Sequence, residues 1–515
     1  MRPTFLGFEA ARSGLVASQK ALDITGNNVA NMETEGYTRQ RVDLVSVSIS
    51  GSNNRYANSL MAGAGVYIVG VSQVRDPYLD ARYREQSSYL GDLATQLTAY
   101  TDMENLFDDV TSSGLQDAMT KFMGQLQDLS NNSEKPENAN SVLTAAKNMV
   151  QLINSYNSKL DQIAKQNQTG LEIGVQNVNS ILEKLASLNT QIKDACLANT
   201  TIDPTTGERR MLGPYGPNEL FDDRNLLLDQ LSAYGEVDVK SESDGTITLN
   251  FAGTEVLKGS KYDTLNLSQD ASGNNVLEWS RSKEDFKAEA GAIKAYVNVL
   301  NGKGGYAVGG ENSYEGIGYY REILNSFADT VATEFNKANT FTDSDGAVHG
   351  GDLFSKSNPA DLSFTAKNLR ISDAWMENSQ YILLSNTTTE GELDTSNLQK
   401  MIKMFDESFT FKSTTTKPDG TPTYTEFTGT FEGYLTHFQN KLGNQTGYIK
   451  GTYESTTSFA TELLDMRDSI SAVSENEEAV NMMKYQKSYN AAARVITAMD
   501  EVLDVLINKM GRVGL

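Results

Sequence analysis

The sequence predicts an α+β protein in which N- and C-terminal helices form a coiled-coil-like end, a long helical bundle forms the body, and one or more β-rich domains are inserted in the middle. Apolar residues recur at helical spacing at both ends and in long stretches between residues 90 and 196. Turn-rich segments interrupt that spacing at 201–285 and 341–430. With 515 residues, 39% of them hydrophobic, the chain can form several cores.

The chain opens with an amphipathic helix. Its apolar face consists of Phe5, Phe8, Leu15 and Leu22. Gly26 tolerates a left-handed cap, so we expect the helix to stop there, with Asn27 and Asn28 extending the stop. Asn31 offers a side chain to nearby backbone, and Gly36 provides a second glycine turn. Taken alone, these residues predict a capped helix followed by a polar loop.

The next segments predict two strands and then a helical bundle. Residues 42–49 and 63–71 read as strands. Helical spacing follows in three stretches, at 90–107, 142–163 and 175–196. Their heptad-like stripes predict a bundle or an antiparallel coiled coil. Cys196, the only cysteine, excludes an internal disulfide and is expected to be a small core residue.

The middle of the chain alternates between strand and helix signals. A short helix is expected at 223–234, followed by hairpin strands separated by Asp-Gly and Gly-Asn turns. Helices are expected again at 288–300 and 320–335. Residues 341–430 contain Thr-, Gly- and Pro-rich pieces and predict a small mixed or irregular outer region.

The C-terminal segment predicts a second terminal helix. A helical stretch at 459–473 is followed by a capping-box sequence, Ser474 to Glu477, where the apolar register shifts. The stripe beyond it includes Tyr485, Tyr489, Ile496, Met499, Leu503 and Leu506.

Together these signals predict four domains. They are a terminal helical domain of 1–41 with 475–515, a helical body of 42–200 with 286–340 and 431–474, a β-rich insert of 201–285, and an outer region of 341–430.

The formal net charge of −23 makes nucleic acid or an anionic membrane surface an unfavourable partner. Residues 1–41 carry five Lys/Arg and four Asp/Glu, and residues 475–515 carry five and six, so the negative charge belongs to the region between them. Nearly neutral ends suit packing against other protein. No run is apolar enough to cross a membrane, and no secretory signal opens the chain. Composition alone therefore predicts a cytoplasmic protein.

Chemistry-bearing residues are sparse, so we expect neither an enzyme, nor a metal site, nor a cofactor. The two histidines, His349 and His437, lie far from the cysteine in sequence. Asp343-Ser-Asp-Gly resembles the opening of a calcium loop but lacks its later ligands, which predicts a polar turn. Acidic pairs such as Asp222–Asp223 and Glu477–Glu478 are common in an acidic chain, and no role is assigned to them.

The two ends together carry a resemblance. Residues 5–31 and 474–508 resemble the opening and closing helices of the bacterial flagellar rod, hook and hook-associated proteins. Gly36-Tyr-Thr-Arg-Gln-Arg41 is similar to the hook-associated members, and so are the inner segments 65–79 and 223–232. Glu35 departs from the small residue or proline that the family often has before Gly-Tyr.

The resemblance implies a structural subunit that joins the flagellar hook to the filament. It implies export through the flagellar type III system without a cleaved signal, which replaces the cytoplasmic expectation with an extracellular, flagellar one. The implied partners are hook protein, a second hook-associated protein, copies of the same chain in a helical layer, and an export chaperone.

The terminal residues acquire roles only through this resemblance. The helix stripes would form the helix–helix core, and a loop shaped by polar residues would meet neighbouring subunits. The loop residues are Asn27, Asn28, Asn31, Gly36, Tyr37 and Arg39. Two alternatives remain open: another axial subunit such as a hook or distal rod protein, or a surface adhesin or enzyme that uses the β-rich middle.

Overall fold

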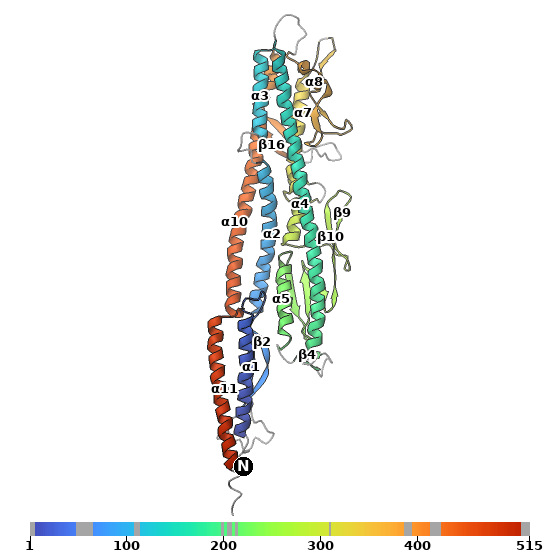
Figure 1. Ribbon diagram of the computed structural model, residues 1–515. Helices are drawn as coiled ribbons and strands as arrows, with labels where there is room; N and C mark the ends of the chain where they lie inside the picture. Colours follow the sequence, from blue (N-terminus) through green and yellow to red (C-terminus); the bar gives the residue numbers. More distant parts are fainter. Residues whose placement is uncertain are drawn as a thin grey trace, which may run out of the picture.

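The computed structural model describes residues 6–47, 65–107, 114–196, 200–202, 209–211, 215–307, 311–343, 345–385, 394–412 and 424–505. The molecule is elongated, and its long helices follow the long axis (Figure 1). Helix α1 (Leu6–Ala30) lies beside α11 (Glu475–Asp504) at one end. The predicted α+β class and the nesting of ends around the body are confirmed.

Long helices form the body. Helix α2 (Pro77–Phe107) lies along α10 (Phe431–Ser471), and α3 (Leu115–Asn131) packs on α4 (Pro136–Cys196). The prediction of separate helices at 142–163 and 175–196 is wrong, because α4 continues through both as one helix of 61 residues. Gly170 in its middle does not break it. A β-carbon there would lie 2.7 Å from Tyr296 Cζ, so the glycine permits a close approach instead.

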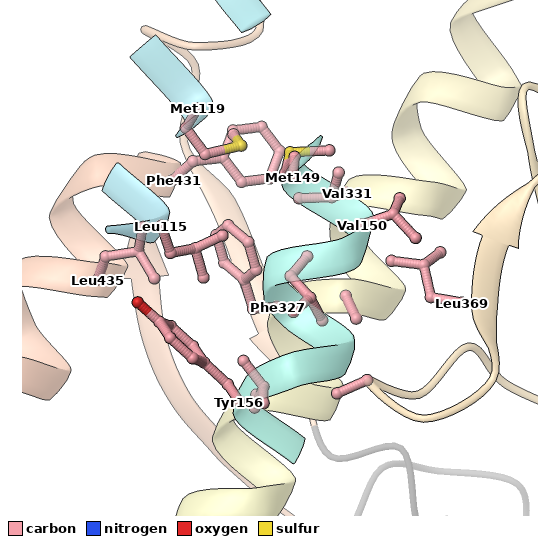
Figure 2. Packing of buried hydrophobic residues seen from close by; sticks show 14 of the residues in the cluster. Leu115, Met119, Met149, Val150, Tyr156, Phe327, Val331, Leu369, Phe431 and Leu435 are labelled. Atoms are coloured by element: carbon pink, nitrogen blue, oxygen red, sulfur yellow. The ribbon is translucent and has the colours of Figure 1, made fainter. Parts of the chain in front are cut away.

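The main apolar cluster joins α2, α3, α4 and α10 with α7 (Ile317–Ala338). Figure 2 shows Leu115, Tyr156, Phe327 and Leu435, one from each of four helices, pointing toward one another. Phe327 is fully buried and stacks 6.3 Å from Tyr434, ring centroid to centroid. The heptad-like stripes of the sequence therefore correspond to a real bundle core.

An antiparallel hairpin connects the terminal end to the body. It pairs β1 (Gln40–Ser46) with β2 (Val66–Gln73). The two strand predictions are confirmed in type, and β1 begins two residues before the predicted start. Ile49, the last residue of the first predicted strand, lies outside the described residues.

The β-rich insert includes α5 (Asn218–Ser232) and packs on the second half of α4. Its strands are β3 (Thr200–Ile202), β4 (Arg209–Met211), β5 (Val237–Ser241), β6 (Ile247–Phe251), β7 (Thr254–Lys258), β8 (Lys261–Tyr262), β9 (Leu265–Gln269) and β10 (Asn275–Trp279). Strands β5 to β8 form one antiparallel sheet, in chain order. Helix α6 (Ala292–Asn301) closes this second apolar cluster, in which Trp279 is fully buried. Cys196 is buried beside Ile192, as predicted.

The outer region consists of short elements packed at the α3 and α7 end. They are β11 (Thr340–Thr342), β12 (Val348–Gly350), β13 (Phe354–Lys356), β14 (Leu369–Ile371), α8 (Asp373–Glu377), η4 (Ser379–Tyr381), α9 (Ser396–Lys403), β15 (Phe409–Lys412) and β16 (Thr425–Gly429). The short helix η3 (Gly304–Tyr306) lies in the body, between α6 and α7. The calcium-like segment is a polar turn, as predicted. Asp343 Oδ1 accepts from the backbone N–H groups of Asp345 and Ala347, and its Oδ2 lies 2.7 Å from His349 Nε2.

One device recurs where helices meet strands. A helix asparagine accepts the backbone N–H of a strand's first residue and donates to the C=O of that same residue, an arrangement that we call an asparagine clip. Five clips occur among the described residues: Asn28 with Gln40, Asn179 with Leu265, Asn189 with Ile247, Asn301 with Asn275, and Asn336 with Phe354. Each clip satisfies both backbone groups of a strand terminus, which would otherwise be costly to bury.

Candidate assembly interface

The paired terminal helices present the predicted stripes to each other. The stripe residues Phe8, Leu15, Leu22, Tyr485, Tyr489, Ile496, Met499 and Leu503 are all half-buried. Met499 covers Gly7, where an added β-carbon would lie 2.7 Å from the Met499 methyl carbon. The most buried apolar residues of α1 are Ala17 and Ala21, because small side chains allow close approach. Phe5 and Leu506 lie outside the described residues.

Helix α1 does not stop at Gly26, contrary to the prediction. It continues to Ala30, and nothing lies within 4 Å of the position that a Gly26 β-carbon would occupy. The helix continues because Asn28, expected to end it, instead bonds outward to β1 as an asparagine clip. The predicted second glycine turn does form at Gly36, where φ is +79°.

Asn28 lies at the centre of a polar joint between the two ends of the chain. Its Nδ2 donates to Glu478 Oε2 over 3.2 Å, and its Oδ1 accepts from Tyr37 Oη over 2.9 Å. Asn28 is 1% exposed and Glu478 is 2% exposed. Arg39 Nε completes the network by pairing with Glu478 Oε1 at 2.9 Å, while a second Arg39 nitrogen pairs with Glu477 at 2.7 Å. A buried carboxylate is tolerated here because a guanidinium and an amide share its charge.

The helix start at Ser474 is confirmed, but the side-chain half of the predicted capping box is absent. Helix α11 begins at Glu475, and the Ser474 side chain makes no capping hydrogen bond. Glu477, which a capping box would turn back toward Ser474, pairs with Arg39 instead. Charge pairing across the joint therefore replaces local capping.

The loop after α1 also contacts the body. An added β-carbon on Gly36 would lie 3.3 Å from Leu226 Cβ of α5, so the turn rests directly on that helix. Arg39 N–H donates to Ser471 O, the end of α10, over 2.9 Å. Burial, together with Asp222, Glu478 and Glu219 nearby, raises the pKa of Tyr37 to about 12. Asn31 stays within the loop, where its Nδ2 donates to Asn27 O over 3.0 Å.

Asp222 of α5 belongs to the same joint. Its Oδ1 accepts from Gln73 Nε2 of β2 over 2.7 Å, and Asn218 Nδ2 donates to Val71 O over 3.2 Å. Burial raises the pKa of Asp222 to about 6, against the lowering effects of Thr38 and Arg75. Sequence reasoning dismissed both Asp222 and Glu478 as ordinary acidic residues. Only their partners, distant in the chain, distinguish them.

Helix α11 exposes apolar side chains on the side turned away from α1, interspersed with the charged residues Lys484, Lys487 and Arg494. Five exposed apolar side chains fall within one sector of the helix, centred near Val480: Val480 is 59% exposed, Met483 55%, Val495 48%, Val502 57% and Val505 45%. A surface helix normally carries polar residues opposite its buried stripe. Exposed apolar side chains gathered on one face are typical of a protein–protein contact.

Neither a metal site nor a membrane span occurs among the described residues. No group of three or more His, Cys, Asp or Glu side chains there is arranged to hold a metal ion. None of the helices that the structure describes combines the length and apolar character needed to cross a membrane.

The ends match family models of flagellar rod proteins. Residues 8–38 match the flagella basal body rod protein model, and residues 468–509 match the C-terminal model of the flagellar basal body rod FlgEFG proteins. Paired terminal helices of this kind place the chain in the class of flagellar axial structural proteins. Between the ends, residues 100–354 match the helical domain of flagellar hook-associated protein FlgK.

Curated relatives narrow the class. Flagellar hook-associated protein 1 of Bacillus subtilis (strain 168) is 30% identical, with 99% of each chain covered. The proteins of the same name from Salmonella typhimurium and Escherichia coli (strain K12) are 24% and 23% identical, covering 97% of this chain and 98% of theirs. The chain belongs to the flagellar hook-associated protein 1 family. It is therefore a structural component of the bacterial flagellum.

A solved structure shares the fold. The flagellar hook junction protein FlgK from Burkholderia pseudomallei superposes with a TM-score of 0.57 at 12% identity, covering 76% of this chain and all of that one. At this identity the likeness concerns the fold alone.

Proposed function

We propose that the chain is the subunit that joins the flagellar hook to the filament, with hook protein on one side and a second hook-associated protein on the other. Relatives that match it over nearly their whole length are named hook-associated protein 1, and the solved neighbour is described as a hook junction protein. The role is structural, because it rests on helix packing and involves no reacting group.

The observation that carries this proposal is the pair of apolar faces on α11. One face packs on α1, and the other, formed by the five exposed side chains around Val480, has no partner within the described chain. Copies of the chain assembled in a helical layer would bury that second face between neighbouring helix pairs. The terminal segments are nearly neutral, so packing them against one another brings little excess negative charge together. Packing the acidic body in the same way would bring much more.

The proposal extends to the rest of the terminal domain. The facing stripes of α1 and α11 hold each subunit's end together. The polar joint, with Asn27, Asn28, Asn31, Gly36, Tyr37 and Arg39, sets the angle at which the body leaves the assembled layer and brings the loop against neighbouring subunits. The terminal pair, the helical body, the β-rich insert and the outer region act as four domains with the boundaries predicted from the sequence.

Export through the flagellar type III system, without a cleaved signal and with a chaperone, is part of the same proposal. Terminal helices that bury most of their apolar surface against neighbouring subunits are only marginally stable in the single chain. They would therefore stay flexible enough to pass through the export channel. The chain would then act outside the cell.

Deleting the gene and imaging the cells by electron microscopy tests the junction role. We expect hooks without attached filaments, filament protein released into the medium, and recovery when the gene is supplied in trans. Normal filaments on the deletion strain would overturn the proposal.

A further inference from the structure

A cavity of about 480 Å³ lies between α2, α5 and the start of the sheet. Its walls include Arg75, just before α2, Arg84 of α2 and Arg224 of α5, so we call it the arginine cavity. Three guanidinium groups around one cavity are unusual in a chain with a net charge of −23. Their partners show which of them are free to bind something else.

Two of the three arginines are neutralised within the chain. Arg75 forms a two-pronged pair with Asp80, at 2.5 Å from Nε and 3.0 Å from a terminal nitrogen. Arg84 Nε pairs with Asp229 Oδ1 at 2.7 Å. The other oxygen of Asp229 is taken by Arg467, also at 2.7 Å, so this carboxylate balances two cations at once. Asp80 and Asp229 are therefore both occupied by other arginines, and neither is left to pair with Arg224.

Arg224 has no carboxylate partner among the described residues. One of its terminal nitrogens donates to Gly245 O over 2.9 Å, and its Nε is buried without any acceptor. The guanidinium lies over the Phe221 ring, 4.9 Å from the centroid. Burial and the nearby Arg84 and Arg75 lower the pKa of Arg224 to about 10, which is the effect expected of a cation held without an anion. Leaving a buried hydrogen-bond donor without an acceptor costs free energy. The surroundings of Arg224 therefore lack an acceptor that would balance its charge.

Three carboxylates also line the cavity: Asp80, which pairs with Arg75, and Asp238 and Glu242, which bond to neutral side chains. Asp238 accepts from Asn250 Nδ2 over 3.3 Å, and Glu242 accepts from Thr248 Oγ1 over 2.9 Å. Neither reaches Arg224 within ion-pairing distance. They restrict a bound anion to the side of the cavity formed by the arginines.

We propose that the arginine cavity binds a small oxyanion, a phosphate or carboxylate group, with Arg224 as its principal ligand. The planar fork of a guanidinium matches two oxygens of such a group, and no carboxylate among the described residues occupies the fork of Arg224. Arg84 and Arg75 add positive field at longer range. The site lies outside the assembly interface and does not depend on the junction role.

Occupancy would stabilise the joint indirectly. Helix α5 carries Arg224 on its cavity side, and it also carries Leu226 under Gly36 and Asp222 against β2. An anion bound by Arg224 would hold α5 against α2 and so preserve the surface on which the loop after α1 rests. A ligand that binds only the folded chain raises its melting temperature.

Calorimetric titration of the full-length chain with sodium phosphate tests the site. A parallel series of melting curves compares phosphate, acetate and citrate with sodium chloride at equal ionic strength. We expect one phosphate per chain and a saturable rise in melting temperature beyond that in chloride. A rise with acetate or citrate alone would assign the site to carboxylates. No heat of binding from any of the three anions, or the same rise in chloride, would overturn the proposal.

Variants locate the binding. Arg224→Met should abolish the anion-dependent rise, and Arg224→Lys should weaken binding by about tenfold, because it keeps the charge but loses the fork. Arg370→Met, a change at an exposed arginine distant in the fold, is the matched control and should bind like the parent. Undiminished binding by Arg224→Met would place the anion elsewhere and refute the assignment. If Arg224→Met does not fold, the comparison of Arg224→Lys with the parent tests the assignment. Equal phosphate affinity in the two would refute it.

Discussion

At the scale of single residues, the joint depends on a few polar side chains that bring three distant segments together. Glu478 lies 450 residues from Asn28 and 439 residues from Arg39, and none of the three is conspicuous in the sequence. The sequence suggested Asn28 and Arg39 as functional because they belong to a recognisable terminal motif. It could not suggest Glu478 or Asp222, since what distinguishes a buried carboxylate is a partner that only the fold provides.

Replacing Glu478 with glutamine should weaken the joint. The change removes the charge that Arg39 pairs with and places an amide N–H₂ against one of two donors, so we expect a loss of about 1–3 kcal/mol in the stability of the terminal domain. Hydrogen exchange at the backbone amides of Arg39 and Gln40 measures it. Glu477→Gln, at a side chain that is 62% exposed, is the control and should change stability by less than about 0.5 kcal/mol. Equal exchange in the two variants would contradict this role for Glu478.

Asp222 should make stability depend on pH. Its pKa is raised from 3.8 to about 6 in the folded chain, so its contribution is fully present below about pH 4 and is lost as pH rises through 6. We expect Asp222→Asn to gain about 1–3 kcal/mol relative to the parent between pH 4.5 and 7.5 in urea unfolding. Asp223→Asn, at the exposed neighbour, should follow the parent. Parallel profiles for Asp222→Asn and the parent would show that the carboxylate titrates normally.

At the scale of elements, the sequence predicted the helices well and their limits less well. Helical spacing alone locates α2, α7, α10 and α11, because a stripe of apolar residues is a local signal. The single helix α4 was predicted as two, since nothing local shows that Tyr296 will pack over Gly170. The stop at Gly26 failed for a similar reason, because the bond from Asn28 to β1 is a tertiary contact.

The two faces of α11 can be separated by neighbouring substitutions. Ile496→Asp places a charge against α1 and should cost about 1–3 kcal/mol in the purified chain. Val495→Asp changes an exposed position and should cost less than about 0.5 kcal/mol, yet prevent assembly. Circular dichroism and limited proteolysis report the first effect, and electron microscopy of complemented deletion cells reports the second. Normal filaments in cells carrying Val495→Asp would remove the outer face from the interface.

The asparagine clips predict a strong effect of a nearly isosteric change. Asn189 is fully buried, donating to Ile247 O over 3.0 Å and accepting from Ile247 N over 3.1 Å. Asn189→Asp would set a carboxylate against that carbonyl, so we expect a loss of about 2–4 kcal/mol at neutral pH in thermal or urea unfolding. Acidification should recover part of it, because the protonated acid can donate. The exposed Lys193→Ala on the same helix is the control.

At the scale of the whole molecule, the body contains large apolar clusters and the terminal helix pair does not. The three apolar clusters contain residues from Ala99 to Ile449 and none from the terminal pair. The presence of helices at both ends and of small sheets in the middle was predictable, because both ends carry helical stripes and the middle carries turns. The packing of the β-rich insert was not predictable, because its sheet shares an apolar cluster with the second half of α4, and that contact exists only in the fold.

A chain trimmed before Val42 and after Val473 should therefore keep a folded body. We expect its cooperative melting transition to lie within a few degrees of the parent's, with the helical signal reduced by the lost ends, and we expect no assembly. Circular dichroism melting and sedimentation compare the two chains. Collapse of the transition would show that the body needs its ends.

The polar joint has a mechanical consequence. Two short segments, residues 74–76 and 472–474, link the terminal end to α2 and α10 of the body. Arg39 lies beside both of them: its backbone O accepts from Val74 N over 2.8 Å, its backbone N–H donates to Ser471 O, and its side chain pairs with Glu478. The joint is held by a small number of directional hydrogen bonds and ion pairs, whereas the close-packed apolar cores of the body resist deformation along their whole length. We therefore expect the terminal helix pair and the body each to be stiff, and bending of the molecule to occur mainly at the few side chains of the polar joint.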